Sequence, residues 1–129
     1  MAADVNLYNK KKGVSIFYAD GILESELGDT LGTLPAGSFV TNAFVNVTTV
    51  STTGSSTVDV KVGSTVIGNE CAATSAGYAA GTPAPAKFAT GGAITVVDGS
   101  TAPAAGDLVF DLYIEYIEYT KTNGELTDV

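Results

Sequence analysis

Two pairs of acids have the residue type and spacing that could support catalysis. Glu24 and Glu26 stand two residues apart, and Asp111 and Glu115 stand four apart, in segments rich in β-forming residues. On a strand the first pair would be separated by roughly 6.6 Å and the second by roughly 13 Å. An inverting glycosidase needs roughly 6.5–9.5 Å, so only the first pair has a suitable spacing. Acids on strands more often keep a sheet soluble and protect its edges, and we favour that interpretation.

Most other catalytic chemistry is excluded by what the chain lacks. Histidine is absent, which removes histidine-activated serine or cysteine nucleophiles and histidine-ligated metal sites. The segment Ala73–Gly77, ATSAG, lacks the first glycine of a nucleophile elbow, so Ser75 is expected to be a loop residue. No phosphate-binding glycine motif or calcium loop occurs. We therefore predict a protein that is not an enzyme and that binds no cofactor and no metal.

Size and charge restrict the partners. A chain of 129 residues suits one domain, and its net charge of −8 would repel the phosphates of nucleic acids. The basic cluster Lys10, Lys11 and Lys12 is either a solvated arm or an electrostatic contact with an acidic neighbour. We expect no binding to nucleic acid.

Cysteine usage and hydropathy also indicate the class of protein. Cys71 is the only cysteine, so no intrachain disulfide can form, and a buried thiol acting as a small hydrophobic residue is expected. The N-terminal sequence MAADVNLYNKKKG lacks the pattern of a secretion signal, and no segment approaches the roughly 18 apolar residues of a membrane span. We expect an unsecreted protein that does not enter a membrane.

The residues that could bind a partner must be positioned by strands, and residues 108–119 give the clearest strand pattern. The segment LVFDLYIEYIEY alternates between an apolar face and a mixed face, as a half-buried strand does. The apolar face is Leu108, Phe110, Leu112, Ile114 and Tyr116. Val109, Asp111, Tyr113, Glu115, Ile117 and Tyr119 share the mixed face.

Turn residues separate the other strand candidates. Asp20-Gly21 lies between two β-prone runs, 14–19 and 22–27, and predicts a hairpin. Gly63-Ser64 predicts a second hairpin over 57–67, in which three alternating valines face the same side.

Two further regions are less regular. Residues 38–50 form a long β-prone run, but Phe44 cannot face the same side as Val45 and Val47, so we expect a bulge or a change of sheet near 42–46. Glycines and a proline over 28–37 predict an irregular segment before that run. Residues 72–106 are rich in alanine and glycine and predict a long loop with one embedded strand at 93–97.

These elements predict an all-β protein, an antiparallel β-sandwich or jelly roll with long Ala/Gly-rich loops. A small closed barrel is the alternative, but unequal strands and long loops favour the sandwich. We expect an extended N-terminal arm at 1–12, a single sandwich domain at 13–120 and a polar tail at 121–129.

The mixed face of the last strand is the candidate binding surface. Tyr113 and Tyr119 lie on it beside apolar residues and acids, and an apolar patch rimmed by acids is typical of binding surfaces. Burial under a loop or second sheet would also explain these tyrosines. A subunit contact is the stronger functional interpretation, because the chain has no tryptophan for a carbohydrate platform.

Four features resemble small head decoration, or cement, proteins of tailed bacteriophages. They are Phe44–Thr49 (FVNVTT), the valine strand and turn Val58–Ser64 (VDVKVGS), the alanine- and glycine-rich middle, and the aromatic and acidic strand end Tyr113–Tyr116 (YIEY). The resemblance covers roughly residues 38–119. It implies a β-sandwich that binds the outside of an icosahedral shell as a homo-oligomer and clamps neighbouring capsid subunits.

The expected function is therefore that of a non-enzymatic virion protein. Its expected partner is the major capsid protein or another virion protein, and its expected location is the capsid surface, with the host cytoplasm during assembly. We expect the arm to order on the partner, with Leu7 and Tyr8 burying apolar area while Lys10, Lys11 and Lys12 meet acidic groups. The loop 72–92 is a second candidate contact. The alternative is a carbohydrate- or receptor-binding β-sandwich module of a tail or fibre.

Overall fold

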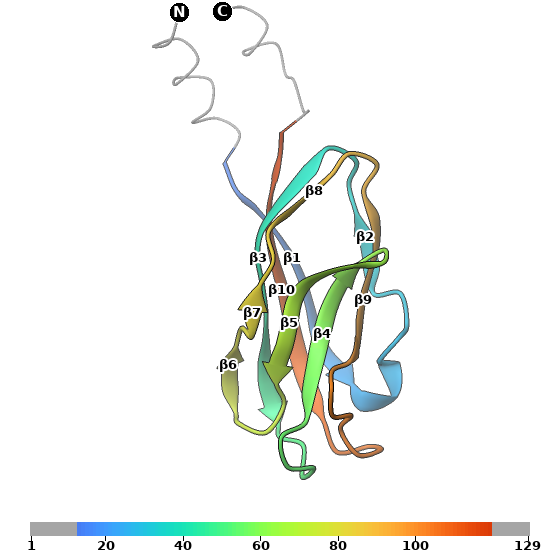
Figure 1. Cartoon of the computed structure of the whole chain (residues 1–129), viewed down its shortest axis with the longest axis vertical. Helices are drawn as coiled ribbons and strands as arrows, with labels where there is room; N and C mark the ends of the chain where they lie inside the picture. The colour runs from blue at the N-terminus through green and yellow to red at the C-terminus, as the bar shows by residue number, and fades with distance from the viewer. Residues whose placement is uncertain (1–12, 120–129) are drawn as a thin grey trace, which may run out of the picture.

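The computed structural model describes residues 13–119, which form two antiparallel five-stranded sheets packed face to face (Figure 1). This arrangement confirms the predicted antiparallel β-sandwich, and the two open sheets do not form the alternative closed barrel. The jelly-roll connectivity stays a prediction. The first sheet contains β1 (Ser15–Leu23), β10 (Val109–Glu118), β3 (Ser38–Thr49), β6 (Gly77–Ala79) and β8 (Ala86–Phe88).

The second sheet has the strand order β2-β9-β4-β5-β7. In Figure 1 its central strands lie in front of β1, β3 and β10. Its strands are β2 (Gly32–Leu34), β9 (Gly92–Asp98), β4 (Thr57–Val62), β5 (Thr65–Ala72) and β7 (Thr82–Pro83). A single turn of 3-10 helix, η1 (Glu24–Glu26), follows β1.

The core lies between the sheets and uses the alternation that the sequence predicts. Alternate residues of β10 and β4 are buried while the residues between them stay partly exposed. Burying one large aliphatic or aromatic side chain contributes about 1.5–3 kcal/mol, so this layer is the main source of stability. The largest buried side chains are Phe110, Leu34, Ile67, Ile94, Leu108, Leu112, Ile114, Val40, Val45, Val58, Val60 and Val62.

The hairpin predicted at Asp20-Gly21 is wrong. One strand, β1, continues through this dipeptide, and both of its halves pair with β10. The register shifts between Ala19 and Ile22, which marks a β-bulge at the dipeptide. Gly21 has a positive φ of 63°, and its N–H donates to Asp111 Oδ1 on β10 at 2.9 Å. A turn dipeptide also suits a bulge, because both need a residue with left-handed backbone.

The irregularity predicted in the long strand β3 is present but displaced. Val40 pairs with Tyr116 and Asn42 with Glu115, so Thr41 is the extra residue of a bulge. The buried positions accordingly change from Val40 to Ala43, a spacing of three. The register is regular from Asn42 to Val47, and Phe44 therefore lies on the outer face of the first sheet.

The hairpin over 57–67 and the strand at 93–97 are confirmed as β4–β5 and β9. The long loop predicted for 72–106 is only partly correct, because it contributes the short strands β6, β7 and β8 to the sheet margins. β2 also forms where an irregular segment was expected, paired with β9. These strands have two or three residues each, so their sequences carry too few positions for a periodic pattern.

Candidate functional site

Four aromatic side chains form a continuous row across the outer face of the first sheet. Tyr18 on β1, Tyr113 on β10 and Phe44 on β3 are consecutive cross-strand partners, and Tyr78 on β6 lies next to Phe44. The ring centroids are 4.8, 5.0 and 4.8 Å apart along the series Tyr18, Tyr113, Phe44, Tyr78. We call these four residues the aromatic row.

The central pair of rings in the aromatic row is stacked, and the two outer pairs are tilted. Phe44 and Tyr113 are nearly parallel, with 12° between their planes, and their centroid distance of 5.0 Å is close to the spacing of neighbouring strands. Two coplanar rings side by side would have centroids farther apart, so these two are stacked. Tyr18 and Tyr78 pack against the two ends at 44° and 51°. The two central rings therefore have their faces covered by other rings.

The row lies within an apolar patch that is open to solvent. Tyr78 is 65% exposed and Tyr18 is 49% exposed, as measured within the described chain. Ile16, two residues before Tyr18 on β1, is also exposed and lies on the same face. An apolar surface that continues across four strands is a feature of binding sites rather than of an ordinary solvated sheet face.

Polar groups beside the row are fixed by hydrogen bonds. The Asp111 carboxylate accepts hydrogen bonds from Gly21 N and Asn46 Nδ2, at 2.9 and 3.1 Å. Glu115 Oε1 accepts one from Thr41 Oγ1 at 3.1 Å. Partial desolvation, and then the charge of Asp111, raise the pKa of the Tyr18 hydroxyl. A tyrosine is already neutral at pH 7 with its ordinary pKa, so the raised pKa only extends the pH range over which Tyr18 stays neutral.

The acid pair Glu24 and Glu26 does not lie along a strand, because these residues form η1. Glu24 Oε1 accepts a hydrogen bond from Gly106 N, and Glu26 Oε1 accepts one from Leu23 N, each at 2.8 Å. Glu24 therefore joins η1 to the loop before β10, whereas Glu26 caps the start of its own turn. The strand geometry that gave this pair a glycosidase-like spacing is absent.

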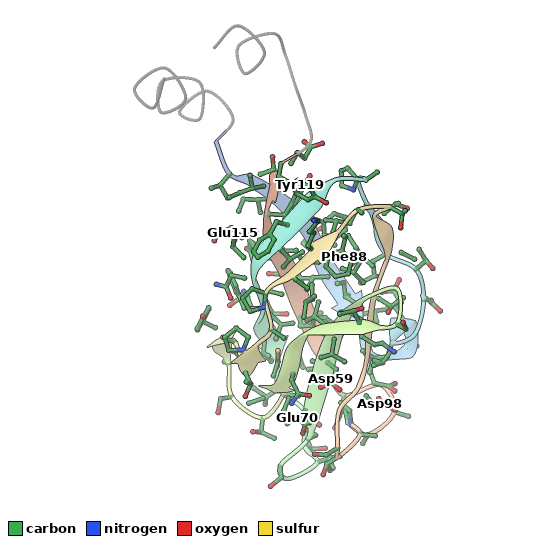
Figure 2. All side chains as sticks on the ribbon, turned by 45° about the horizontal axis from the view of Figure 1, so that its top comes forward. Asp59, Glu70, Phe88, Asp98, Glu115 and Tyr119 are labelled. Atoms are coloured by element: carbon green, nitrogen blue, oxygen red, sulfur yellow. The ribbon has the colours of Figure 1, made fainter. Side chains whose placement is uncertain are left out.

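A second group of acids lies around Glu70 on β5. Figure 2 shows Asp59, Glu70 and Asp98 near one end, away from Glu115 and Tyr119. Hydrogen bonds from Ser100 Oγ and then from Thr57 Oγ1 to the Glu70 carboxylate are the largest causes that lower the pKa of Glu70. Ser100 N also donates to this carboxylate, at 2.8 Å. Glu70 thereby joins β5 to the turn after β9. Within residues 13–119 no cluster of acids and cysteine has the arrangement of a metal site.

Of the two tyrosines predicted at the site, only Tyr113 belongs to the aromatic row. Tyr119 follows β10, roughly 20 Å along the strand from Tyr113. There its ring meets the ammonium group of Lys87 at 5.4 Å, and its N–H donates to Gly37 O. The other predicted contacts, Leu7, Tyr8, Lys10, Lys11 and Lys12, lie outside the described residues.

Three members of the row, Tyr18, Phe44 and Tyr78, were not predicted from the amino-acid sequence. Phe44 alternates with Val45 and Val47, so a strand that buries these two valines has the Phe44 side chain on its outer face. This pattern was the one sequence feature that indicated an aromatic residue on that face. The partnership with Tyr18 and Tyr78 depends on strand neighbours that are distant in the sequence. Such pairing is not visible in local periodicity.

Cys71 is buried, as predicted, and burial is the largest cause that raises its thiol pKa to about 12. A thiol with this pKa is almost wholly protonated at neutral pH and is a poor nucleophile. Cys71 therefore belongs to the core rather than to a reactive site.

No protein-family model matches the chain, and no curated protein or solved structure is significantly similar to it. Within residues 13–119 there is no helical segment with the length and hydropathy of a transmembrane helix.

Proposed function

We propose that this chain is a non-enzymatic structural protein of a bacteriophage virion, which binds the outer surface of the capsid and stabilises the shell. The aromatic row is the observation that supports the proposal most directly. Tyr18, Tyr113, Phe44 and Tyr78 form an open apolar surface, whereas the neighbouring carboxylates are occupied by hydrogen bonds within the fold. Such a surface suits contact with another protein, and the major capsid protein is the proposed partner.

Ring geometry favours a protein partner over a carbohydrate. A sugar ring stacks on an aromatic face, but the faces of Tyr113 and Phe44 are already packed against other rings. The row presents ring edges instead, together with the more exposed rings of Tyr18 and Tyr78 at its two ends. Aromatic side chains of this kind are often the residues that dominate the free energy of protein–protein binding.

Stabilisation of a shell follows from differential binding. A protein that binds the assembled shell more tightly than its free subunits shifts the equilibrium toward assembly, and many bound copies multiply a modest free energy per site. The large β-sandwich core supports this role because it keeps the aromatic row in a fixed arrangement.

The first prediction concerns Tyr78→Ala and Tyr18→Ala in capsid binding. Each change removes an exposed end of the row without emptying the core, so we expect the fold to be retained. Loss of an interface tyrosine that dominates binding costs about 2 kcal/mol, or roughly a thirtyfold rise in the dissociation constant. Co-sedimentation with capsids of the cognate major capsid protein measures this change, with circular dichroism confirming the fold.

Tyr119→Ala is the matched control, because it removes the same side chain outside the row. We expect this variant to bind capsids as the parent chain does. Unchanged capsid binding by both row variants, or an equal loss with Tyr119→Ala, would show that the row is not the contact. Binding of an oligosaccharide that is lost with Tyr78→Ala would favour the alternative, a carbohydrate- or receptor-binding module.

A further inference from the structure

Two carboxylates flank the aromatic row on the outer face of the first sheet. Asp111, Tyr113 and Glu115 follow each other on β10 at the two-residue spacing of one strand face, and all three are partly exposed. The two acids therefore lie on either side of Tyr113 along the strand, with roughly 13 Å between their backbone positions. The row is thus an apolar strip with a carboxylate on each side of its centre.

Hydrogen bonds fix the positions of these two acids without cancelling their charge. Every donor is a neutral group, namely a backbone N–H and a side-chain amide for Asp111 and a hydroxyl group for Glu115. A carboxylate that accepts from neutral donors keeps its negative charge, and its two oxygens offer about four acceptor positions. Both acids can therefore form an ion pair with a partner while they stay bonded within the fold.

The lysines of the described chain do not balance this charge. Within residues 13–119 acids far outnumber bases, and Lys61 and Lys87 are the only basic residues. Lys61 lies between two buried valines of β4, so its side chain is on the outer face of the second sheet, on the far side of the core. Lys87 meets the ring of Tyr119, roughly 20 Å along the strand from Tyr113. In the described chain the aromatic row therefore lies in a negative electrostatic field.

This charge determines which kind of surface can cover the row. Two copies of the chain that met through their rows would bring Asp111 and Glu115 of both copies into one interface, and like charges placed together weaken binding. The phosphate groups of a nucleic acid or of an anionic membrane are repelled for the same reason. A protein surface that carries lysine or arginine is attracted instead, and its charges are complementary to those beside the row.

We infer that the aromatic row binds a basic segment of the partner protein, in which an apolar side chain packs on the ring edges while two lysine or arginine side chains meet Asp111 and Glu115. In an extended segment, two basic residues four positions apart match the roughly 13 Å between the two acids, and the residue midway between them faces Tyr113. The inference rests on the proposed function in that the row is the contact. It adds the chemical character of the surface that the row contacts.

The first test measures co-sedimentation with capsids of the cognate major capsid protein. Asp111→Asn and Glu115→Gln each remove one charge and leave an amide oxygen that can accept hydrogen bonds within the fold. Each should raise the dissociation constant about two- to fivefold, as expected for an exposed ion pair, and the double variant about tenfold. Asp98→Asn, the same change at an exposed acid on β9 of the second sheet, is the matched control and should bind as the parent chain does.

Salt provides a second measurement on the same samples. Raising the salt concentration from about 50 to about 500 mM should weaken capsid binding by the parent chain more than by the double variant, because salt screens exposed ion pairs. Circular dichroism checks that each variant keeps the fold.

A peptide titration separates this inference from the proposed function. The probe is the peptide Gly-Arg-Ser-Leu-Ser-Arg-Gly, and in the control peptide both arginines are replaced by glutamates. The basic peptide, added to the full chain labelled with nitrogen-15, should shift the amide resonances of Tyr18, Phe44, Tyr78 and Tyr113. The shifts should be much smaller in the double variant, and the acidic peptide should leave the resonances unchanged.

Each outcome bears on one of the two proposals. If the chain binds capsids, equal binding by the parent and the double variant, or an equal loss with Asp98→Asn, would overturn the inference and leave capsid binding in place. If the chain does not bind capsids, the capsid function is contradicted and the peptides decide. Shifts confined to the basic peptide would then support the inference, whereas equal shifts with both peptides, or none with either, would overturn it.

Discussion

Individual carboxylates in this protein stabilise turns. Glu70 accepts hydrogen bonds from Thr57 and Ser100, and Asp107 accepts them from Thr52 N and Thr52 Oγ1 at 2.8 and 2.7 Å. The hydrogen bond donated by the Ser100 hydroxyl is the largest cause that lowers the pKa of Glu70, and the one donated by the Thr52 hydroxyl is the largest cause for Asp107. The role of both residues is therefore to join loops to strand ends, and it depends on the ionised carboxylate.

The second prediction concerns acid. Because the pKa of Glu70 and Asp107 is lower in the folded chain than in the unfolded chain, the unfolded chain binds protons first as the pH falls. Their contribution is complete above the ordinary carboxyl pKa and is lost below about pH 4.5. We expect the free energy of unfolding, measured by urea titration, to decrease over that range. Glu70→Gln should flatten the decrease, and parallel pH profiles for the parent and Glu70→Gln would contradict this assignment.

At the scale of elements, β1 depends on one glycine. Gly21 has a positive φ, and its N–H donates to Asp111 on the neighbouring strand β10. A Cβ at Gly21 would meet no heavy atom within 4 Å, so the requirement for glycine is conformational rather than steric. The bulge at this position redirects β1 into η1 and keeps both halves of β1 paired with β10.

The third prediction is that Gly21→Ala lowers the free energy of unfolding by about 1–2 kcal/mol, the cost of left-handed backbone for a residue with a Cβ. Gly21→Asn should cost less, because asparagine adopts this conformation more readily. Chemical denaturation of both variants gives the comparison. Equal stability of parent and Gly21→Ala would show that the bulge relaxes to another register at no cost.

At the scale of the whole molecule, the two sheets depend on a shared core. Phe110 on β10 is fully buried and belongs to the same cluster as Val60 on β4 and Ile94 on β9. The first sheet alone would expose this face to water. The aromatic row therefore depends on the second sheet for its support, although that sheet contributes no residue to the row.

The fourth prediction follows from this shared core. Phe110→Ala should lower the free energy of unfolding by about 3–5 kcal/mol, because it removes a large buried side chain and leaves a cavity. Tyr78→Ala, which removes a mostly exposed ring, should cost much less. Thermal and urea unfolding measure both. A similar loss for the two variants would mean that the row, rather than the interior, dominates the stability of the sandwich.

Much of the sandwich could be predicted because strand faces are a local property. The alternation in Val58, Val60 and Val62, and in residues 108–114, placed the same side chains in the core that the structure buries. The burial of Cys71 followed from its residue type in the same way. Local alternation needs only a few consecutive residues, so it is readable without knowledge of the neighbours.

The candidate site could be predicted only in part. Tyr113 was found on the outer face of its strand, but the row joins it to Tyr18 and Phe44, 95 and 69 residues away in the sequence. Asp20-Gly21 has the same composition whether it forms a turn or a bulge, and pairing of both sides with β10 selects the bulge. The amino-acid sequence thus determined which residues share one face of a strand. Which strands became neighbours, and therefore which side chains form one surface, was settled by long-range pairing and by the packing of two sheets around a single core.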